Sequence, residues 1–242
     1  MKKKKVGNFK VSVIFPSYNE SENIVEAIGR VSKSLGRSLY EVIVVDDNSP
    51  DQTWKIVQNM QNPKYKVIRR MKERGLASAI ARGVEEAKGN VVVWLDCDLG
   101  IPPEEIPRLI EKLKDYDVAI GSRYVKGGRE TRPKWRAALS YMTNLFACWV
   151  LGFYVRDYTS GFAAVRKEVL DKIKLSKKGF GEYFVEFMYK CVKNNFSIAE
   201  VGYVYGSRKS GLSKSDGNLF ILLRYGFQYG WKIIKLRTIG HV

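Results

Sequence analysis

Hydrophobic residues form two different patterns along the first half of the chain: continuous runs and a repeat every three to four positions. Continuous apolar runs are typical of parallel strands buried on both faces, whereas apolar residues recurring every three to four positions are typical of amphipathic helices. The first pattern predicts strands over 11–15, 41–45, 66–69, 91–95 and 118–120. The second predicts helices over 21–35, 52–60, 77–88 and 103–114. Alternation of this kind predicts an α/β fold with a mainly parallel central sheet.

The second half of the chain is less regular. A basic, glycine-containing loop over 121–134 precedes a long apolar helix at about 135–151. The remaining pattern predicts strands over 162–165 and 197–205, and helices over 167–173, 183–193 and 217–237. Since no internal repeat or low-complexity linker divides the chain, we expect one main domain over 1–214 and a separate tail over 215–242.

Composition narrows the chemistry. With 42 Lys and Arg against 25 Asp and Glu, the net charge is +17, which suits nucleic acid, an acidic membrane surface or a phosphorylated substrate. His241 is the single histidine, so a Ser-His-Asp triad and an HExxH zinc helix are excluded. Cys97, Cys148 and Cys191 are too few and too far apart for a disulfide framework, and they suit a reducing compartment.

Acidic residues stand directly after two of the predicted strands. Asp46 and Asp47 follow the run VIVV, and Asp96 and Asp98 follow VVVWL. In open α/β sheets this edge is where ligands bind. An Asp-x-Asp turn offers hard oxygen ligands to Mg²⁺ or Mn²⁺, which can neutralise a diphosphate. The alternative is that these aspartates only form turns and cap the next helices.

Other polar residues lie in turns that could face the same edge. Tyr18 and Glu20 follow the first strand and could stack on and hydrogen-bond to a base; alternatively, they form an ordinary turn with Ser21 as helix cap. Basic residues in later turns could bind phosphates, although each alone would be ordinary surface: Arg123, Arg136, Arg208 and Lys214.

Six ordered blocks make a resemblance plain. They are VIFPSYNESENI at 13–24, VIVVDDNSPDQT at 42–53, the stretch 74–107 with its LDCDLG turn, DVAIGSRYVKGG at 117–128, DYTSGFAAVRKEVL at 157–170 and RKSGLSKSDGN at 208–218. The chain resembles the family-2 glycosyltransferases of GT-A fold, and among them the dolichol-phosphate mannosyltransferase group. The resemblance implies a GT-A nucleotide-sugar-binding fold with a C-terminal amphipathic interfacial helix, and assigns catalysis to 1–214.

The resemblance also implies site residues. For the donor they are Pro16, Tyr18, Glu20, Val45, Asp47, Asp96, Cys97, Asp98, Arg208 and Lys214. For the acceptor phosphate they are Arg123, Arg136, Ser140 and Arg208. Asp96 and Asp98 would bind Mg²⁺ or Mn²⁺, and the catalytic residues would be Asp98, Arg123 and Arg208.

The chain departs from the family pattern at two glycines. Gly100 replaces a glutamine that usually binds the metal, and Gly202 replaces a common proline, which we expect to be tolerated. We expect Gln at position 100 to tighten metal binding, unless Gly100 needs a positive φ.

The implied reaction is inverting transfer of mannose from GDP-mannose to dolichyl (polyprenyl) phosphate. Because this acceptor is already ionised, no general base is required, which fits a chain with one histidine near its end. The alternatives are transfer of glucose from UDP-glucose to a polyprenyl phosphate, and a non-catalytic basic protein that binds phosphate or nucleic acid. A nucleic-acid partner is disfavoured because it leaves the Asp pairs unexplained.

The longest uncharged stretch, 137–155, is long enough to suggest a membrane span. A single span there would separate Asp96 and Asp98 from Arg208 and Lys214, so we expect helix 135–151 to lie in the interface or to pack on the domain. The tail predicts a polar stripe of Arg224, Gln228, Lys232 and Lys235 beside an apolar stripe of Phe220, Leu223, Phe227, Trp231 and Ile234. The alternative for the tail is a helix docked on the domain.

Together these patterns predict a peripheral (monotopic) protein on the cytoplasmic face of a membrane with an anionic surface. A membrane-anchoring partner subunit is left open.

Overall fold

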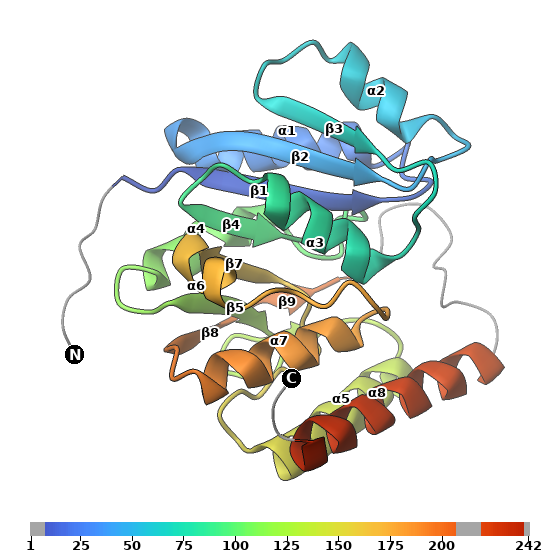
Figure 1. Cartoon of the computed structure of the whole chain (residues 1–242), viewed down its shortest axis with the longest axis vertical. Helices are drawn as coiled ribbons and strands as arrows, with labels where there is room; N and C mark the ends of the chain where they lie inside the picture. The colour runs from blue at the N-terminus through green and yellow to red at the C-terminus, as the bar shows by residue number, and fades with distance from the viewer. Residues whose placement is uncertain (1–7, 207–218, 240–242) are drawn as a thin grey trace.

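A seven-stranded sheet forms the centre of the molecule, whose computed structural model describes residues 8–206 and 219–239 (Figure 1). The strands are β1 (Val11–Ser17), β2 (Leu39–Asp46), β3 (Tyr65–Arg69), β4 (Val91–Trp94), β5 (Val118–Ser122), β7 (Ala163–Arg166) and β8 (Ile198–Gly202). Their spatial order is β3-β2-β1-β4-β7-β5-β8. Only β7 runs antiparallel to its neighbours in this sheet. The predicted α/β fold with a mainly parallel sheet is confirmed.

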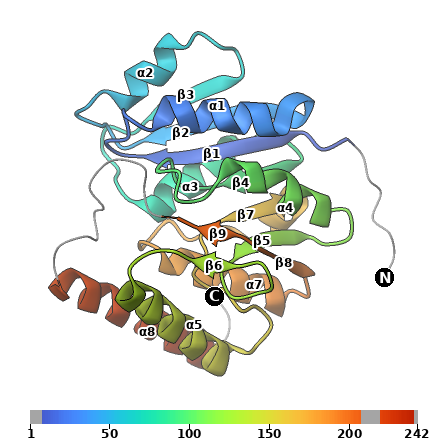
Figure 2. The same cartoon turned by 180° about the vertical axis from the view of Figure 1, so that it is seen from behind.

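Helices cover both faces of the sheet. They are α1 (Ile24–Leu35), α2 (Thr53–Asn59), α3 (Leu76–Glu86), α4 (Ile106–Lys112), α5 (Lys134–Leu151), α6 (Lys167–Lys172), α7 (Glu182–Lys193) and α8 (Leu219–Ile239). Figures 1 and 2 show α1 and α4 on one face, α3 and α7 on the other, and α5 and α8 side by side at one end of the molecule. Each predicted helix is present, with boundaries that move by a few residues.

The strands are continuously apolar because both of their faces are buried. Along β1, Val13 and Phe15 pack into the cluster that includes α1 and α4, whereas Ile14 packs into the cluster that includes α3 and α7. All three side chains are fully buried. Successive residues of a strand point to opposite faces, so a sheet covered on both sides selects apolar residues at every position.

The segment predicted as one strand over 197–205 is two strands. After β8 the chain passes the buried Tyr203 and forms β9 (Val204–Tyr205). β9 pairs in parallel with β6 (Arg129–Glu130), which lies inside the predicted basic loop. A two-residue strand has no detectable periodicity, and only the long-range pairing defines it. The pairing of β6 with β9 therefore fixes the loop 121–134 against the segment 204–205.

The start of α1 differs from the prediction. The helix begins at Ile24, and Ser21 is not its cap, because Asn23 occupies that position without a side-chain cap bond. Instead, the Ser21 backbone N donates to Asp51 Oδ2 at 3.0 Å. The residues before α1 are thus fixed by a contact with the loop that follows β2.

The tail helix α8 docks on the domain with one face and exposes another. Tyr225 stacks on Phe180 with ring centroids 4.9 Å apart, and Ile233 is fully buried. Lys232 forms an ion pair with Glu186 of α7. Lys232, predicted on the polar stripe of the tail, is thus half-buried and faces α7. For Phe220 and Leu223 the structure describes the helical backbone but not the side chains.

Within the described residues, no helix combines the length and the hydropathy needed to cross a bilayer. This finding agrees with the prediction that the uncharged stretch 137–155 does not form a span.

Gly202 ends β8 where another turn of the chain approaches closely. A Cβ at this position would lie 2.3 Å from the Lys126 carbonyl oxygen and 2.5 Å from the Gly128 nitrogen. Both are backbone atoms, which cannot rotate away. The close approach explains a glycine here.

We expect Gly202→Ala to lower the free energy of unfolding by about 1–3 kcal/mol, the usual cost of overpacking. Gly29→Ala is the matched control, because Gly29 lies mid-helix in α1 with nothing within 4 Å of its added Cβ. It should raise stability by about 0.5–1 kcal/mol. Urea denaturation measures both changes, and equal stabilities would contradict the close approach.

Candidate active site

The predicted site residues converge at one edge of the sheet. Parallel strands β1, β2, β4 and β5 end there and lead into Tyr18, Asp47, Asp96 and Arg123, respectively. The chain places β2 and β3 on one side of β1 and β4 on the other. Open α/β sheets bind ligands at such a reversal of strand order. Arg208 and Lys214 lie outside the described residues.

Asp46 is part of the scaffold. It is fully buried and accepts hydrogen bonds from Ser17 Oγ at 2.7 Å, Ser49 N at 2.8 Å and Ser49 Oγ at 2.6 Å. These bonds join the end of β1 to the turn after β2. For Asp46, the turn-forming alternative is the one that the structure supports.

Asp47 forms a buried ion pair with Arg70, which the sequence analysis missed. Arg70 Nε donates to Asp47 Oδ1 at 2.7 Å, and Gly75 N donates to Oδ2 at 2.8 Å. The same guanidinium donates to Ser78 Oγ at 2.8 Å and to the Gly75 carbonyl at 3.0 Å. Asp47 thus positions the turn before α3. The missed signal is that Arg70 directly follows a predicted strand, as the aspartates do.

The turn over 18–21 is an ordered lip at this edge. Asn19 has a left-handed φ of 59°, and its backbone N donates to Ser49 Oγ at 3.0 Å. The Glu20 backbone N donates to Thr53 Oγ1 at 3.0 Å. The Arg74 guanidinium lies 5.3 Å from the centroid of the half-buried Tyr18 ring, within cation–π range. Pro16, Tyr18 and Glu20 are all half-buried, and their contact with a nucleoside remains a prediction.

Two of the predicted donor residues have side chains directed into the protein. Val45 is fully buried in the core, and Cys97 is 1% exposed. Cys97 Sγ donates to the Pro16 carbonyl at 3.6 Å. Burial and the nearby Glu20 carboxylate raise the pKa of the Cys97 thiol well above its usual range, so the thiol stays protonated. The assignment of Val45 and Cys97 to the donor site stays a prediction; the structure shows that both side chains are packed inside the protein.

The Asp-x-Asp turn is tightly constrained. Asp98 is 2% exposed, and its Oδ1 accepts a hydrogen bond from Gly100 N at 2.9 Å. Leu99 has a left-handed φ of 61°, which is unusual for a residue with a branched side chain. Strained backbone of this kind persists where the surrounding contacts determine it, often at functional sites. The bond from Gly100 N holds the Asp98 carboxylate within this turn.

The carboxylates of this turn fit a divalent cation only as a partial ligand set. Among residues 8–206 and 219–239, no group of three or more His, Cys, Asp or Glu could hold a metal ion. Asp96 and Asp98 can supply carboxylate oxygens, which Mg²⁺ and Mn²⁺ prefer, and a diphosphate supplies further oxygens.

A side chain at position 100 would fit tightly beside Asp98. The φ of Gly100 is not positive, so the backbone would allow a side chain. However, a Cβ would lie 3.1 Å from Asp98 Oδ1 and 3.3 Å from the Gly206 carbonyl oxygen. The expectation that Gln at position 100 tightens metal binding stays a prediction: the φ of Gly100 does not oppose the substitution, but the Asp98 carboxylate or the Gly206 carbonyl would have to shift by a few tenths of an ångström.

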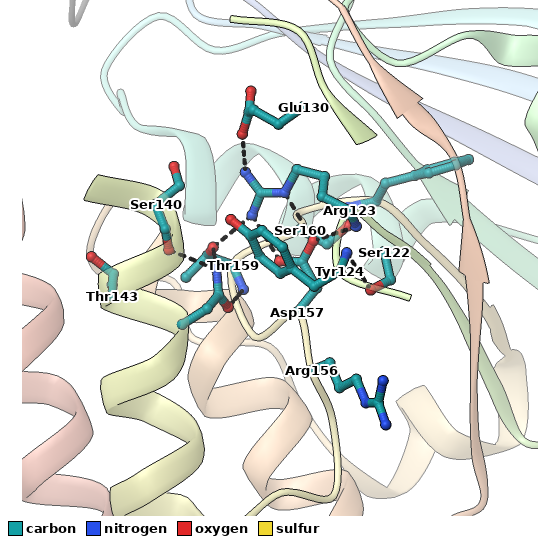
Figure 3. A network of polar contacts seen from close by, with 12 residues as sticks. Ser122, Arg123, Tyr124, Glu130, Ser140, Thr143, Arg156, Asp157, Thr159 and Ser160 are labelled. Atoms are coloured by element: carbon teal, nitrogen blue, oxygen red, sulfur yellow. Dashed lines mark hydrogen bonds and ion pairs between the residues drawn. The ribbon is translucent and has the colours of Figure 1, made fainter. Parts of the chain in front are cut away.

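Arg123 lies at the centre of a second, buried network (Figure 3). Its Nε donates to Asp157 Oδ2 at 2.9 Å and its Nη2 to Asp157 Oδ1 at 2.7 Å and Thr159 Oγ1 at 2.8 Å. The side chains of Arg123 and Asp157 are 5% and 0% exposed. Burial alone would lower the pKa of Arg123, but the Asp157 charge raises it well above its usual range. A phosphate would have to share Arg123 with these partners.

Two further charged residues lie between this pair and Ser140, one of the predicted acceptor residues. Glu130 contacts Arg123 Nη1 at 3.3 Å and also pairs with Arg132, whose Nη2 lies 3.1 Å from Ser140 Oγ. Arg136, in the first turn of α5, is half-buried with its guanidinium 5.0 Å from the Trp135 ring. The structure thus links Arg123 and Ser140 through Glu130 and Arg132. Sequence reasoning missed both linking residues, because charged residues in a loop look like ordinary surface.

Tyr205 joins the two halves of the site. Its ring lies 4.7 Å from the Arg132 guanidinium, and its Cε2 would be 3.4 Å from a Cβ at Gly100. Burial and the Asp98 charge raise the pKa of Tyr205 to about 12, so the hydroxyl stays protonated. The backbone continues the link, since Gly206 N donates to the Gly100 carbonyl at 2.9 Å.

Asp157→Ala should lower the free energy of unfolding by about 3–5 kcal/mol, because it leaves the buried Arg123 charge without its main partner. Glu111→Ala is the matched control: Glu111 pairs with Lys114 at 2.6 Å on the surface, and its loss should cost about 0–1 kcal/mol. Denaturant titration measures both values. A similar loss of unfolding free energy in the two variants would show that the buried pair does not stabilise the fold.

Comparison with known proteins identifies the family of this chain. The model of glycosyl transferase family 2 matches residues 12–174. The dolichol-phosphate mannosyltransferase of Pyrococcus furiosus is 42% identical over 96% of this chain and 68% of its own length. The polyprenol monophosphomannose synthase of Mycolicibacterium smegmatis is 35% identical over 85% of this chain and 81% of its own.

Solved structures show the same fold. Glucosyl-3-phosphoglycerate synthase from Mycobacterium tuberculosis, crystallised with Mn²⁺ and UDP, superposes with a TM-score of 0.73 over 95% of this chain and 80% of its own, at 19% identity. The same enzyme has also been crystallised with Mg²⁺ and UDP. The family match, the two relatives and the shared fold lead to one conclusion: the chain belongs to glycosyl transferase family 2, in the dolichol-phosphate mannosyltransferase group, and is a sugar-transferring enzyme.

Proposed function

We propose that the enzyme transfers mannose from GDP-mannose to a polyprenyl phosphate such as dolichyl phosphate, with inversion at the anomeric carbon. The names of the relatives support this reaction, and the two-sided character of α5 is the observation that carries it. One side of α5 bears Arg136 and Ser140, which belong to the proposed acceptor site, and the other is apolar and exposed.

The exposed side of α5 is a regular stripe. Its large apolar residues recur every three to four positions and are between 39% and 75% exposed: Trp135, Leu139, Met142, Leu145, Phe146 and Trp149. Exposed aromatic patches of this kind mark interaction sites. A lipid whose tail stays in a bilayer against this stripe could reach the inner side of the same helix with its phosphate.

The helix α8 extends the apolar stripe. It lies beside α5 in Figures 1 and 2, and its Phe227, Trp231 and Ile234 are 73%, 63% and 45% exposed. The exposed Arg224, Lys235 and Arg237 suit anionic headgroups. We call the exposed apolar residues of α5 and α8 the lipid face. We propose that this face lies on the cytoplasmic surface of a membrane, a side that suits the three buried free cysteines.

The chemistry needs positioning more than proton transfer. The acceptor phosphate attacks the anomeric carbon as an ionised oxygen, so no base is required. Asp96 and Asp98 would hold Mg²⁺ or Mn²⁺, which neutralises the diphosphate leaving group. We assign Tyr18, Glu20 and Asp47 to the nucleoside, and Arg208 and Lys214 to the phosphates. In this scheme Arg123 orients the acceptor phosphate from its fixed place beside Asp157.

Purified protein given radiolabelled GDP-mannose, dolichyl phosphate and Mg²⁺ or Mn²⁺ should form an acid-labile mannolipid that extracts into organic solvent. Asp98→Ala should lower kcat about a hundredfold or more without unfolding the protein, because it removes charge stabilisation at the leaving group. Asp115→Ala is the matched control: Asp115 is exposed between α4 and β5, and its replacement should leave kcat unchanged. Faster transfer from UDP-glucose would overturn the donor assignment, and no transfer from any nucleotide sugar would favour a phosphate-binding role.

Replacing Trp149 and Trp231 by Ser should weaken binding to anionic vesicles about tenfold or more, since each indole loses apolar contact with lipid. Val25→Ser is the control, because Val25 is 49% exposed on α1, away from α5 and α8 (Figure 2). Vesicle co-sedimentation measures binding, and added salt should weaken it. Unchanged sedimentation of the double variant would show that membranes bind elsewhere.

A further inference from the structure

Glu130 lies beside Arg123 in the proposed acceptor site (Figure 3), and its carboxylate also pairs with Arg132. Its side chain is 7% exposed. Oε2 lies 3.3 Å from Arg123 Nη1 and 2.8 Å from Arg132 Nη2, and Oε1 pairs with Arg132 Nε. Because Arg132 Nη2 is also 3.1 Å from Ser140 Oγ, this carboxylate adjoins two groups assigned to the acceptor phosphate.

The two carboxylates on Arg123 differ in how firmly they are bound. Asp157 accepts hydrogen bonds from Arg123 Nε, Nη2 and the backbone N, and its side chain is fully buried. Glu130 contacts only Nη1, at the longer distance of 3.3 Å, and stands on the two-residue strand β6. On Arg123, Asp157 is thus the firmly bound partner and Glu130 the weakly bound one, whereas Arg132 engages both oxygens of Glu130.

Charge balance shows what a phosphate would meet here. Arg123 and Arg132 carry two positive charges, and Asp157 and Glu130 carry two negative ones. A phosphate that reached Arg132 and Ser140 would add one or two negative charges beside Glu130. Like charges repel strongly where water is scarce, whereas a guanidinium binds phosphate as well as it binds carboxylate. One anion must therefore give way to the other.

We propose that Glu130 is an internal stand-in for the acceptor phosphate, and that acceptor binding is an exchange in which the phosphate replaces the Glu130 carboxylate on Arg132. The proposal rests on the proposed function, and it adds Arg132 to the phosphate ligands. Before exchange, Glu130 keeps Arg132 oriented, which lowers the ordering cost of binding. A neutral lipid alcohol has no charge with which to displace Glu130, so the device selects phosphorylated lipids.

Glu130→Gln tests the exchange, since it keeps the shape and hydrogen-bonding oxygen of the side chain but removes the competing charge. With full-length protein, calorimetry should show about tenfold tighter binding of inorganic phosphate, as expected when a charged competitor is lost. In the transfer assay, KM for a short, water-soluble isoprenyl phosphate should fall. Glu111→Gln, on the exposed pair with Lys114, should change neither value. A merely structural Glu130 predicts weaker binding or none of these gains.

Arg132→Met supplies the second test, which stands even if the Glu130 variant fails to fold. Inorganic phosphate should bind about tenfold more weakly than to wild type, because a bidentate partner is lost. Arg129→Met removes the same charge at an exposed position next to Glu130 and should have little effect. Equal affinity in wild type and Arg132→Met, or no tightening in a folded Glu130→Gln protein, overturns the exchange. Phosphate binding that follows the prediction without any sugar transfer would leave the exchange standing and refute the proposed function.

Discussion

The buried ion pair between Arg123 and Asp157 connects most of the elements that build the site. Arg123 follows the end of β5, and Asp157 stands in the loop before β7. A charged pair this deeply buried is costly unless every donor finds an acceptor, so the pair imposes its geometry on what surrounds it. Thr159 accepts from Arg123 and also bonds to Asn144 of α5, with Asn144 Nδ2 at 2.6 Å from Thr159 Oγ1. The sheet and the long helix are thereby held in one arrangement.

A second chain of contacts leads from this pair to the Asp-x-Asp turn. Glu130 contacts both Arg123 and Arg132. The Arg132 guanidinium in turn lies over the ring of Tyr205. The Tyr205 strand, β9, then leads to Gly206, whose nitrogen bonds to the Gly100 carbonyl. The residues proposed for the donor and for the acceptor are therefore parts of one connected structure. A change in the acceptor half has a short physical path to Asp98.

The position of α5 explains how an enzyme without a described membrane-spanning helix could use a membrane lipid. One helix cannot bury all of its faces against a sheet, and α5 buries Asn144, Ala147, Cys148 and Leu151 while exposing its aromatic stripe. Arg136 and Ser140, which we propose for the acceptor phosphate, lie on the inner side near the start of the helix. The sequence of α5 is only weakly amphipathic for this reason: its inner face is polar at one end and apolar at the other, while its outer face is apolar.

The sequence by itself determined the elements whose pattern is local. The runs before Asp46 and Asp96 are apolar at every position because both sheet faces are covered, and this alone predicted β2, β4 and their place at the binding edge. Six ordered motifs identified the family.

Only the tertiary structure decided which of the charged residues at that edge are partners. Asp47 with Arg70, Arg123 with Asp157, and Glu130 with Arg132 are pairings set by topology. The same holds for Lys232, which turns inward to Glu186, and for β6, which exists only through β9. Periodicity records which faces are buried, but the free energy of an ion pair or a two-residue strand depends on a partner that only the folded chain brings near.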